Sequence, residues 1–188
     1  MEEEREFCFD CERKQFLYKK GFPLCVYNKG MHKSIAAFKY KGRKEYGTFY
    51  GEEIVKKYEV VFKMLQVDGL IPVPIHKSRK NTRGYNQAEV IAMEIGKRLK
   101  IPVIKDLLVR NKKTLPQKEL GNKERMWNLE QAFEIKQDLL SKDIKLEKVI
   151  IVDDIYTTGS TIEACTKALL KAGISEVYFT SVCIGMGM

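Results

Sequence analysis

The 188-residue chain has no long apolar segment, and no run approaches the roughly 18 residues needed to cross a membrane. Its first residues, MEEEREF, are acidic, which is unlike a secretory signal peptide. Its five cysteines are odd in number and scattered, which argues against a disulfide framework. No internal repeat or low-complexity tract is present. These absences predict a cytoplasmic globular protein.

Two common nucleotide-binding motifs are also missing. There is no G-x-x-x-x-G-K-[ST] and no G-x-G-x-x-G, so neither a P-loop nor a dinucleotide fingerprint is expected. The composition, with 44% hydrophobic and 31% charged residues, is typical of one globular domain. Lys and Arg number 34 against 25 Asp and Glu, which gives a net charge of +9. This excess favours anionic partners, such as phosphorylated metabolites, nucleic acid or acidic lipid.

Apolar strand-like runs alternate with amphipathic helical segments along the chain. The expected strands are Leu70–Ile75, Pro102–Val109, Ala132–Ile135, Val149–Asp153 and Val177–Ile184. The expected helices are Lys33–Tyr40, Glu45–Lys57, Asn86–Lys100 and Thr161–Ala172. This alternation predicts an α/β fold with a parallel sheet of about five strands flanked by helices. In such sheets ligands bind at the carboxyl ends of the strands.

The segment VIIVDDIYTTGST, from Val149 to Thr161, places two acids at the end of an apolar strand. Asp153 and Asp154 can accept hydrogen bonds from vicinal hydroxyl groups. Ser160 and Glu163 match a capping box that starts the next helix, whose first N–H groups are donors for an anion. The residues expected to form this phosphate cup are Thr157, Thr158, Gly159, Ser160 and Thr161. Together the two features predict a ribose 5-phosphate site, and the alternative is a polar loop beside solvated acids.

A basic segment follows the first predicted strand of this set, in LIPVPIHKSRKNTRGYNQAE. Pro72 and Pro74 predict that the strand is short or distorted. A basic loop at its end could neutralise a pyrophosphate group, because Arg can bind two oxygens at once. The residues assigned to this loop are Lys77, Arg79, Arg83, Gly84, Asn86 and Gln87. A solvated basic loop without a ligand is the alternative.

A third segment, RNKKTLPQKELGNKERMWN, is long and polar and lies between two predicted strands. Loops of this length are often lids, which can shield a reactive sugar cation from water. A plain surface excursion is an equally good interpretation. The residues assigned to this flexible loop are Arg110, Thr114, Gln117 and Arg125.

These blocks make the chain similar to the type I phosphoribosyltransferases and, within them, to the ComF family linked to bacterial natural competence. The matching blocks are FKYKG, PVPIHKSRKNTRGYNQ, RNKKTLPQ, ERMWNLEQAF and VDDIYTTGST. The resemblance implies the type I phosphoribosyltransferase fold and a ligand that is phosphoribosyl pyrophosphate, with Mg²⁺, or a nucleoside monophosphate. Asp153 and Asp154 are then implied to hold the ribose hydroxyls, and residues 157–161 the 5-phosphate. The implied reaction transfers ribose 5-phosphate to an unidentified acceptor.

The amino terminus departs from the ComF pattern, in which paired cysteine knuckles usually bind zinc. Only Cys8 and Cys11 have knuckle spacing here, and four-coordinate Zn²⁺ needs two more ligands. Cys25 and His32 are candidates, although Cys25 lies in an apolar stretch typical of a core thiol. We therefore divide the chain into an N-terminal segment, residues 1–30, that resembles a partial knuckle, and a phosphoribosyltransferase-like domain, residues 31–188. Two free thiols are the alternative to zinc.

Two other functions stay open. The ComF resemblance also implies a non-catalytic protein that handles single-stranded DNA and has a regulatory nucleotide site. Residues 38–50 interleave aromatic and basic side chains, which could stack on bases and neutralise phosphates, although aromatics facing the core explain the same pattern. The second alternative is a nucleobase-type phosphoribosyltransferase in salvage. A homodimer is also a candidate assembly.

Overall fold

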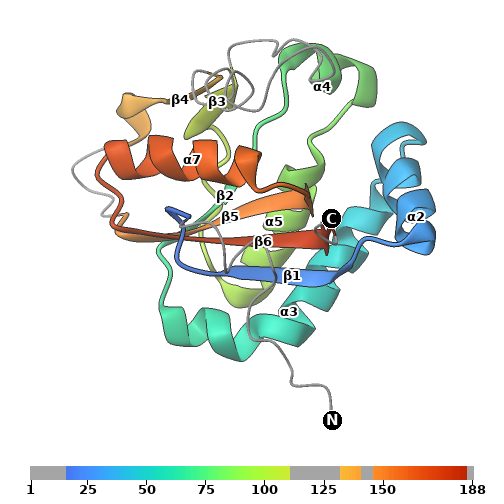
Figure 1. Ribbon diagram of the computed structural model, residues 1–188, viewed down its shortest axis with the longest axis horizontal. Helices are drawn as coiled ribbons and strands as arrows, with labels where there is room; N and C mark the ends of the chain where they lie inside the picture. Colours follow the sequence, from blue (N-terminus) through green and yellow to red (C-terminus); the bar gives the residue numbers. More distant parts are fainter. Residues whose placement is uncertain (1–15, 111–131, 141–145, 186–188) are drawn as a thin grey trace.

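The structure, a computed structural model, describes residues 16–110, 132–140 and 146–185. Its centre is a four-stranded sheet (Figure 1). In order across the sheet, the strands are β1 Gly21–Val26, β6 Glu176–Ile184, β5 Lys148–Tyr156 and β2 Gly69–Pro72. All neighbours are parallel. The predicted α/β class with a parallel sheet is confirmed, with four strands instead of five in the described part of the chain.

Two of the predicted strands do not join this sheet as strands. The segment 102–109 contributes an isolated parallel bridge between Val103 and Leu70, and then β3, Leu108–Arg110. β3 pairs antiparallel with β4, Phe133–Ile135, in a separate two-stranded sheet. A run of three strand residues carries too little periodicity to reveal its partner, so the sequence could not separate this small sheet from the large one.

The first strand, β1, was not predicted from its sequence, GFPLCV. It lies at the edge of the sheet and pairs with β6, with Pro23 opposite Ser181. Proline is tolerated at an edge because one side of the strand needs no ladder hydrogen bond. Residues 21–26, which fall in the N-terminal segment defined above, therefore lie in the same sheet as β5 and β2.

Helices cover both faces of the large sheet (Figure 1). α3 Glu45–Leu65 and α5 Gln87–Leu99 pack on one face, and α7 Ser160–Lys171 packs on the other. α2 Lys29–Tyr40 follows β1 at the carboxyl end of the sheet. These four helices confirm the predicted ones. Two short elements were not predicted, namely α4 Lys77–Arg83 and the 3-10 turn η1 Gln137–Leu139.

No helix in the described ranges is both long enough and apolar enough to span a membrane. The core instead consists of two apolar clusters, one on each face of the sheet. Ile71, Val149 and Ile151 face α7, whereas Leu70 and Ile150 face α3 and α5. Because both faces of β5 are covered, its residues are apolar without alternation. β5 is thereby held at the centre of the molecule, and the position of its carboxyl end is fixed.

α3 and α5 approach each other closely at glycine residues of α3. A Cβ atom on Gly51 would lie 2.7 Å from the Cβ of Glu94 and 3.2 Å from the carbonyl oxygen of Ile91. Neither atom is the end of a flexible side chain, so an added methyl group would push the helices apart. The close approach of α3 and α5 therefore depends on the absence of a side chain at Gly51.

We expect Gly51→Ala to lower the free energy of unfolding by about 1–3 kcal/mol, the usual effect of overpacking. The reason is that the two helices must separate, although alanine has the higher helix propensity. Val60→Ala is the control, because Val60 is 71% exposed on the same helix. Denaturation in urea measures both, and a Gly51→Ala variant as stable as the original chain would contradict the expectation.

Candidate functional site

The two adjacent acids lie within β5, near its carboxyl end. Successive side chains of a strand point to opposite faces, so the two carboxylates have different surroundings. Asp153 lies close to Arg110 of β3 and to the buried Cys165 of α7. Asp154 faces α2 and forms an ion pair with Lys39, whose Nζ is 2.8 Å from Asp154 Oδ1. The carboxylate of Asp153 therefore lies on the α7 side of the sheet, and that of Asp154 lies on the α2 side.

Asp153 is an unusual carboxyl group. Burial, and after it the charge of Asp154, raise its pKa to about 7. The backbone N–H of Asp154 donates to Asp153 Oδ1 at 2.8 Å, and this bond together with Lys39 and Arg110 opposes the rise. Burial of this carboxylate thus outweighs the stabilising interactions that oppose the rise in its pKa, a situation that is common at functional sites.

Lys39 was not assigned to the site from the sequence, although it lies in the FKYKG block. The side chains of Lys39 and Asp154 are only 18% and 13% exposed, so their attraction is weakly screened. Because 115 residues separate them in the chain, no local sequence pattern could predict that they pair. Lys39 compensates one of the two negative charges and orients Asp154 at the end of β5.

The phosphate cup is formed by the turn after β5 and the start of α7. Gly159, with φ of +76°, occupies the N-cap position, and the helix begins at Ser160. Thr157 and Thr158 are exposed, and Thr161 is half-buried. The first N–H groups of such a helix have no intrahelical acceptor, and here no side chain caps them. The five predicted residues are therefore brought together around donors suited to an anion.

The predicted capping box is wrong. Gly159 takes the N-cap position, which places Ser160 inside the first turn of the helix. The Ser160 hydroxyl lies 2.9 Å from that of Thr158. Glu163 does not reach back to the helix start, since both of its carboxylate oxygens accept the N–H of Leu17 at 3.1 Å. This difference leaves the cup open, because a capping side chain would occupy the donors.

Residues 77–83 form the short helix α4, where a loop was expected. His76 caps it by accepting the N–H of Ser78 at Nδ1, and Gly84, with φ of +78°, ends it. Lys77 and Arg79 are exposed. Arg83 is half-buried, with its guanidinium 5.0 Å from the centre of the Tyr40 ring. The helix therefore presents Lys77 and Arg79 to solvent and holds Arg83 against α2.

Asn86 and Gln87 are buried, and their polar groups bind within the protein. Asn86 caps α5 by accepting the N–H of Ala88 at 3.1 Å, and its amide donates to the carbonyl of Val73 at 3.0 Å. Gln87 accepts from Arg83 at 3.1 Å and donates to the carbonyl of Phe38 at 3.4 Å. In this structure the two residues attach the start of α5 to α4, to α2 and to Val73, the residue after β2.

Arg110 comes from β3 and is half-buried above the ring of Phe133, at 5.4 Å. Burial lowers the pKa of its guanidinium, and the charge of Arg79 lowers it further. Arg110 of β3 is thus influenced both by Arg79 of α4 and by Asp153 of β5. The other residues assigned to the flexible loop, Thr114, Gln117 and Arg125, lie outside the described residues.

Two carboxylates can suffice for Mg²⁺, because Mg²⁺ is usually held by one or two carboxylates together with substrate phosphates and water. Asp153 and Asp154 could each supply one such carboxylate, and because they point to opposite faces of β5 they do not form one pair of ligands. In the part of the chain with defined positions, no group of three His, Cys, Asp or Glu side chains could hold a metal ion. Cys8 and Cys11, the proposed zinc ligands, lie outside that part. Cys25 contacts Cys183, with the sulfur atoms 3.7 Å apart.

The fold is a parallel α/β sheet flanked by helices, and comparison with known proteins gives the family. Residues 85–186, more than half of the chain, match the phosphoribosyl transferase domain. Competence protein F of Haemophilus influenzae is 36% identical over 110 residues, which are 58% of this chain and 47% of that protein. Competence protein ComFC of Bacillus subtilis is 27% identical over 172 residues, 88% of this chain and 67% of that protein.

The chain is therefore a member of the phosphoribosyl transferase domain family, in the ComF group. DNA utilization protein YhgH of Escherichia coli strain K12 is 28% identical over 116 residues, 62% of this chain and 49% of that protein. The chain spans about half the length of the Haemophilus and Escherichia relatives. A hypothetical protein from Neisseria gonorrhoeae, solved with bound ppGpp, has a TM-score of 0.41 and 14% identity over 84% of this chain and 69% of that chain.

The raised pKa of Asp153 predicts a pH-dependent stability. The pKa is about 7 in the folded chain, against the usual 3.8, so the folded state retains a proton that the unfolded state loses as the pH rises. Stability therefore decreases from about pH 4 to pH 7, and Asp153→Asn removes this decrease. As the pH rises from acidic to mildly alkaline, the free energy of unfolding of the variant should increase by roughly 1–3 kcal/mol relative to that of the original chain.

Denaturation at several pH values measures this difference. Asp138→Asn, at an exposed carboxylate of η1, is the reference for the same chemical change without burial. A stability difference between Asp153→Asn and the original chain that is equal at all pH values would contradict the assigned surroundings of Asp153.

Proposed function

We propose that this chain binds phosphoribosyl pyrophosphate with Mg²⁺ at the carboxyl ends of β5 and β2. One observation carries the proposal: Asp153 and Asp154 are followed, within a few residues, by Gly159 and by a helix start that no side chain caps. A vicinal diol needs hydrogen-bond acceptors, and a phosphate monoester needs donors. A ribose 5-phosphate presents both groups to this pair of features.

The proposed reaction is transfer of ribose 5-phosphate to an acceptor. The bond between C1 of the ribose and the pyrophosphate oxygen breaks, C1 bonds to the acceptor nucleophile, and pyrophosphate leaves with the electron pair. Asp153 and Asp154 hold the ribose hydroxyls, the cup holds the 5-phosphate, and Lys77 and Arg79 stabilise charge on the leaving group. Mg²⁺, when bound, neutralises charge on the pyrophosphate oxygens.

The names of the relatives connect them with competence and DNA utilization, so we propose a role in DNA uptake, in the cytoplasm, for this chain as well. A nucleobase acceptor, as in salvage, is the first acceptor class to test. Release of pyrophosphate from phosphoribosyl pyrophosphate on addition of nucleobases distinguishes an enzyme from a protein that only senses the nucleotide.

Asp154→Asn should weaken binding of phosphoribosyl pyrophosphate and Mg²⁺ by about 1–3 kcal/mol, because a charged acceptor for the ribose hydroxyls is lost. Glu59→Gln is the matched control: it removes the same charge on α3, where Glu59 pairs with Lys63 at 2.6 Å. Its affinity should equal that of the original chain. Titration calorimetry measures both affinities, and an unchanged affinity for Asp154→Asn would refute the assignment of that residue.

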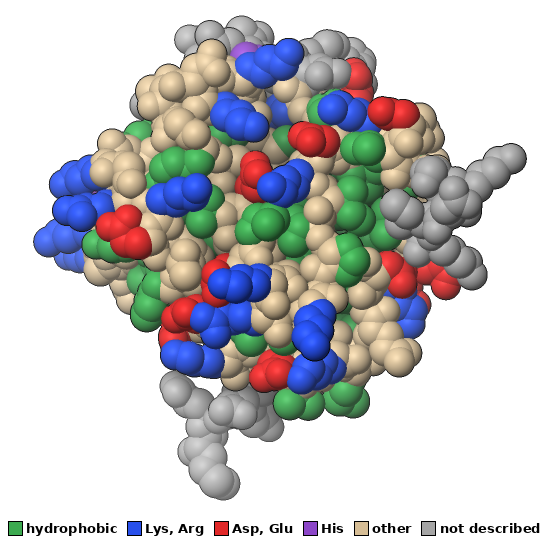
Figure 2. All heavy atoms as spheres, turned by 180° about the vertical axis from the view of Figure 1, so that it is seen from behind, with side chains coloured by type: hydrophobic (Ala, Val, Ile, Leu, Met, Phe, Trp, Pro, Cys, Tyr) green, Lys and Arg blue, Asp and Glu red, His purple; other side chains and the backbone are tan. Residues whose placement is uncertain are grey.

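A second candidate function is binding of single-stranded DNA, and a specific surface favours it. Two adjoining hollows of about 620 and 500 Å³ lie along α5 and share Lys80, Asn86, Glu89 and Lys105. The lysines that line them are Lys44, Lys77, Lys80, Lys97, Lys105 and Lys136. Seen from behind, the molecule carries Lys and Arg side chains over much of its surface, with acids between them (Figure 2). The same hollows are also lined by Glu89, Glu94, Asp106 and Glu134, so the excess of lysine is what suits this groove to a flexible polyanion.

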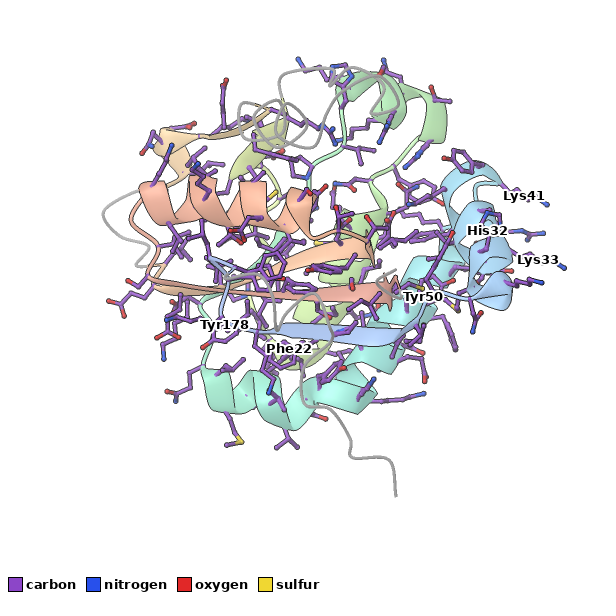
Figure 3. The ribbon with its side chains drawn as sticks, viewed as in Figure 1. Phe22, His32, Lys33, Lys41, Tyr50 and Tyr178 are labelled. Carbon is purple, nitrogen blue, oxygen red and sulfur yellow. The ribbon has the colours of Figure 1, made fainter. Side chains whose placement is uncertain are left out.

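The aromatic side chains of residues 38–50 support this candidate only in part. Phe38 and Tyr50 are 0% and 2% exposed and belong to the core, so they cannot stack on bases. Tyr40 is 72% exposed and lies against Arg83. Its exposed ring could therefore stack on a base. Lys33 of α2 and Lys41, which directly follows that helix, extend away from the sheet (Figure 3).

DNA binding in this groove should depend on salt. Lys80→Gln combined with Lys97→Gln should reduce the log–log salt slope by about 1.4, because each lost phosphate contact with a single strand removes about 0.7. Lys171→Gln, at an exposed end of α7, is the control and should leave the slope unchanged. Fluorescence titrations with an oligonucleotide at several salt concentrations measure the slope, and a flat response in the original chain discards this candidate.

A further inference from the structure

The segment before β1 packs against the start of α7. The N–H of Leu17 donates to both carboxylate oxygens of Glu163, at 3.1 Å each. The N–H of Lys19 donates to the carbonyl of Val177 on β6 at 2.8 Å. Residues 17–19 are thereby attached both to β6 and to the first turn of the helix that forms the phosphate cup.

Two tyrosine hydroxyl groups meet beneath the cup. The Tyr18 and Tyr156 oxygens are 2.7 Å apart, and the two side chains are 8% and 3% exposed. The Tyr156 ring stacks on Phe179 at 4.8 Å and 8°, while the Tyr18 ring meets Phe179 edge-on at 4.9 Å and 78°. Phe179 and the Tyr18 hydroxyl therefore hold the Tyr156 ring from two directions.

The backbone of the cup rests on this ring. Tyr156 is the last residue of β5, and the chain turns back over it, so that a Cβ on Gly159 would lie 2.5 Å from its hydroxyl oxygen and 2.9 Å from Cζ. The Tyr156 carbonyl accepts the N–H of Gly185 at 2.7 Å, which fixes the other side of the residue. Movement of the Tyr156 hydroxyl would therefore move the backbone at Gly159.

We infer that Tyr18 is a positioning residue for the phosphate cup. It does not touch the ligand: its hydroxyl orients Tyr156, and Tyr156 supports Gly159 and the first turn of α7. Donors that are already in place bind an anion without further ordering of the loop, which increases affinity. This inference rests on the proposed function in one respect, namely that the cup binds the 5-phosphate of the ligand.

Tyr18→Phe removes the hydroxyl and keeps the ring. Tyr178→Phe is the matched control, because the Tyr178 hydroxyl also makes a 2.7 Å hydrogen bond, to Glu176 of the same strand. Tyr178 lies on the opposite face of the sheet, beside Phe22 and toward α3 (Figure 3). Tyr156→Phe removes the other partner of the hydrogen bond and should reproduce the effect of Tyr18→Phe.

The first measurement is amide hydrogen exchange of the ligand-free full chain at Glu163 and Gly185, whose N–H groups donate to the carbonyls of Gly159 and Tyr156 at 2.8 and 2.7 Å. Tyr18→Phe and Tyr156→Phe should each increase exchange there about fivefold to tenfold, the factor that corresponds to the loss of one buried hydrogen bond. Tyr178→Phe should leave exchange at these residues unchanged. Unchanged exchange in Tyr18→Phe, or an increase spread evenly over the whole chain, overturns the inference whether or not the ligand assignment is right.

The second measurement compares two ligands by calorimetry. Tyr18→Phe should weaken binding of ribose 5-phosphate about fivefold and leave binding of Mg²⁺-pyrophosphate unchanged, because only the first ligand reaches the cup. The double variant Tyr18→Phe, Tyr156→Phe should lose less affinity than the sum of the two single variants, since both single variants lose the bond between these hydroxyls. Equal losses for both ligands, or no loss, overturn the positioning role; failure of the original chain to bind ribose 5-phosphate instead overturns the proposed function, and exchange then decides the inference.

Discussion

The burial of β5 is the constraint on which the site depends. β2 and β6 flank this strand, and apolar side chains cover both of its faces, so its carboxyl end has one position relative to every other element. The last part of the strand nevertheless carries Asp153 and Asp154, which water would otherwise solvate. The carboxylate form of Asp153 is consequently unfavourable: burial and then the charge of Asp154 raise its pKa to about 7.

Basic side chains from distant parts of the chain stabilise the two negative charges to different extents. Lys39 of α2 pairs directly with Asp154, whereas Arg110 of β3 approaches Asp153 with a guanidinium that is itself partly buried and close to Arg79. Basic side chains from α2 and β3 therefore lie beside the two acids. A ligand that brings both a divalent cation and phosphate oxygens would interact with the acids and with these basic side chains, which is consistent with the proposed donor.

The phosphate cup depends on the packing below it as much as on its own sequence. The turn after β5 can leave its N–H groups uncapped because Gly159 replaces a capping side chain and lies directly on the Tyr156 ring. Tyr18 and Phe179 fix that ring from the other side. Preorganised donors of this kind bind an anion strongly, and the aromatic cluster is the reason that an open turn can keep its shape.

Local pattern was enough to predict the parallel α/β class, the four main helices, the strand that carries Asp153 and Asp154 near its carboxyl end, and the turn at Gly159, because each depends on neighbouring residues. It could not predict the edge strand β1, the separate β3–β4 sheet or the missing capping box, since these depend on which segments pair in space. The pairing of Lys39 with Asp154 and the contact of Tyr18 with Tyr156 join residues more than a hundred positions apart. Only the tertiary structure decides such contacts, because periodicity reports which face of an element is buried but not what covers it.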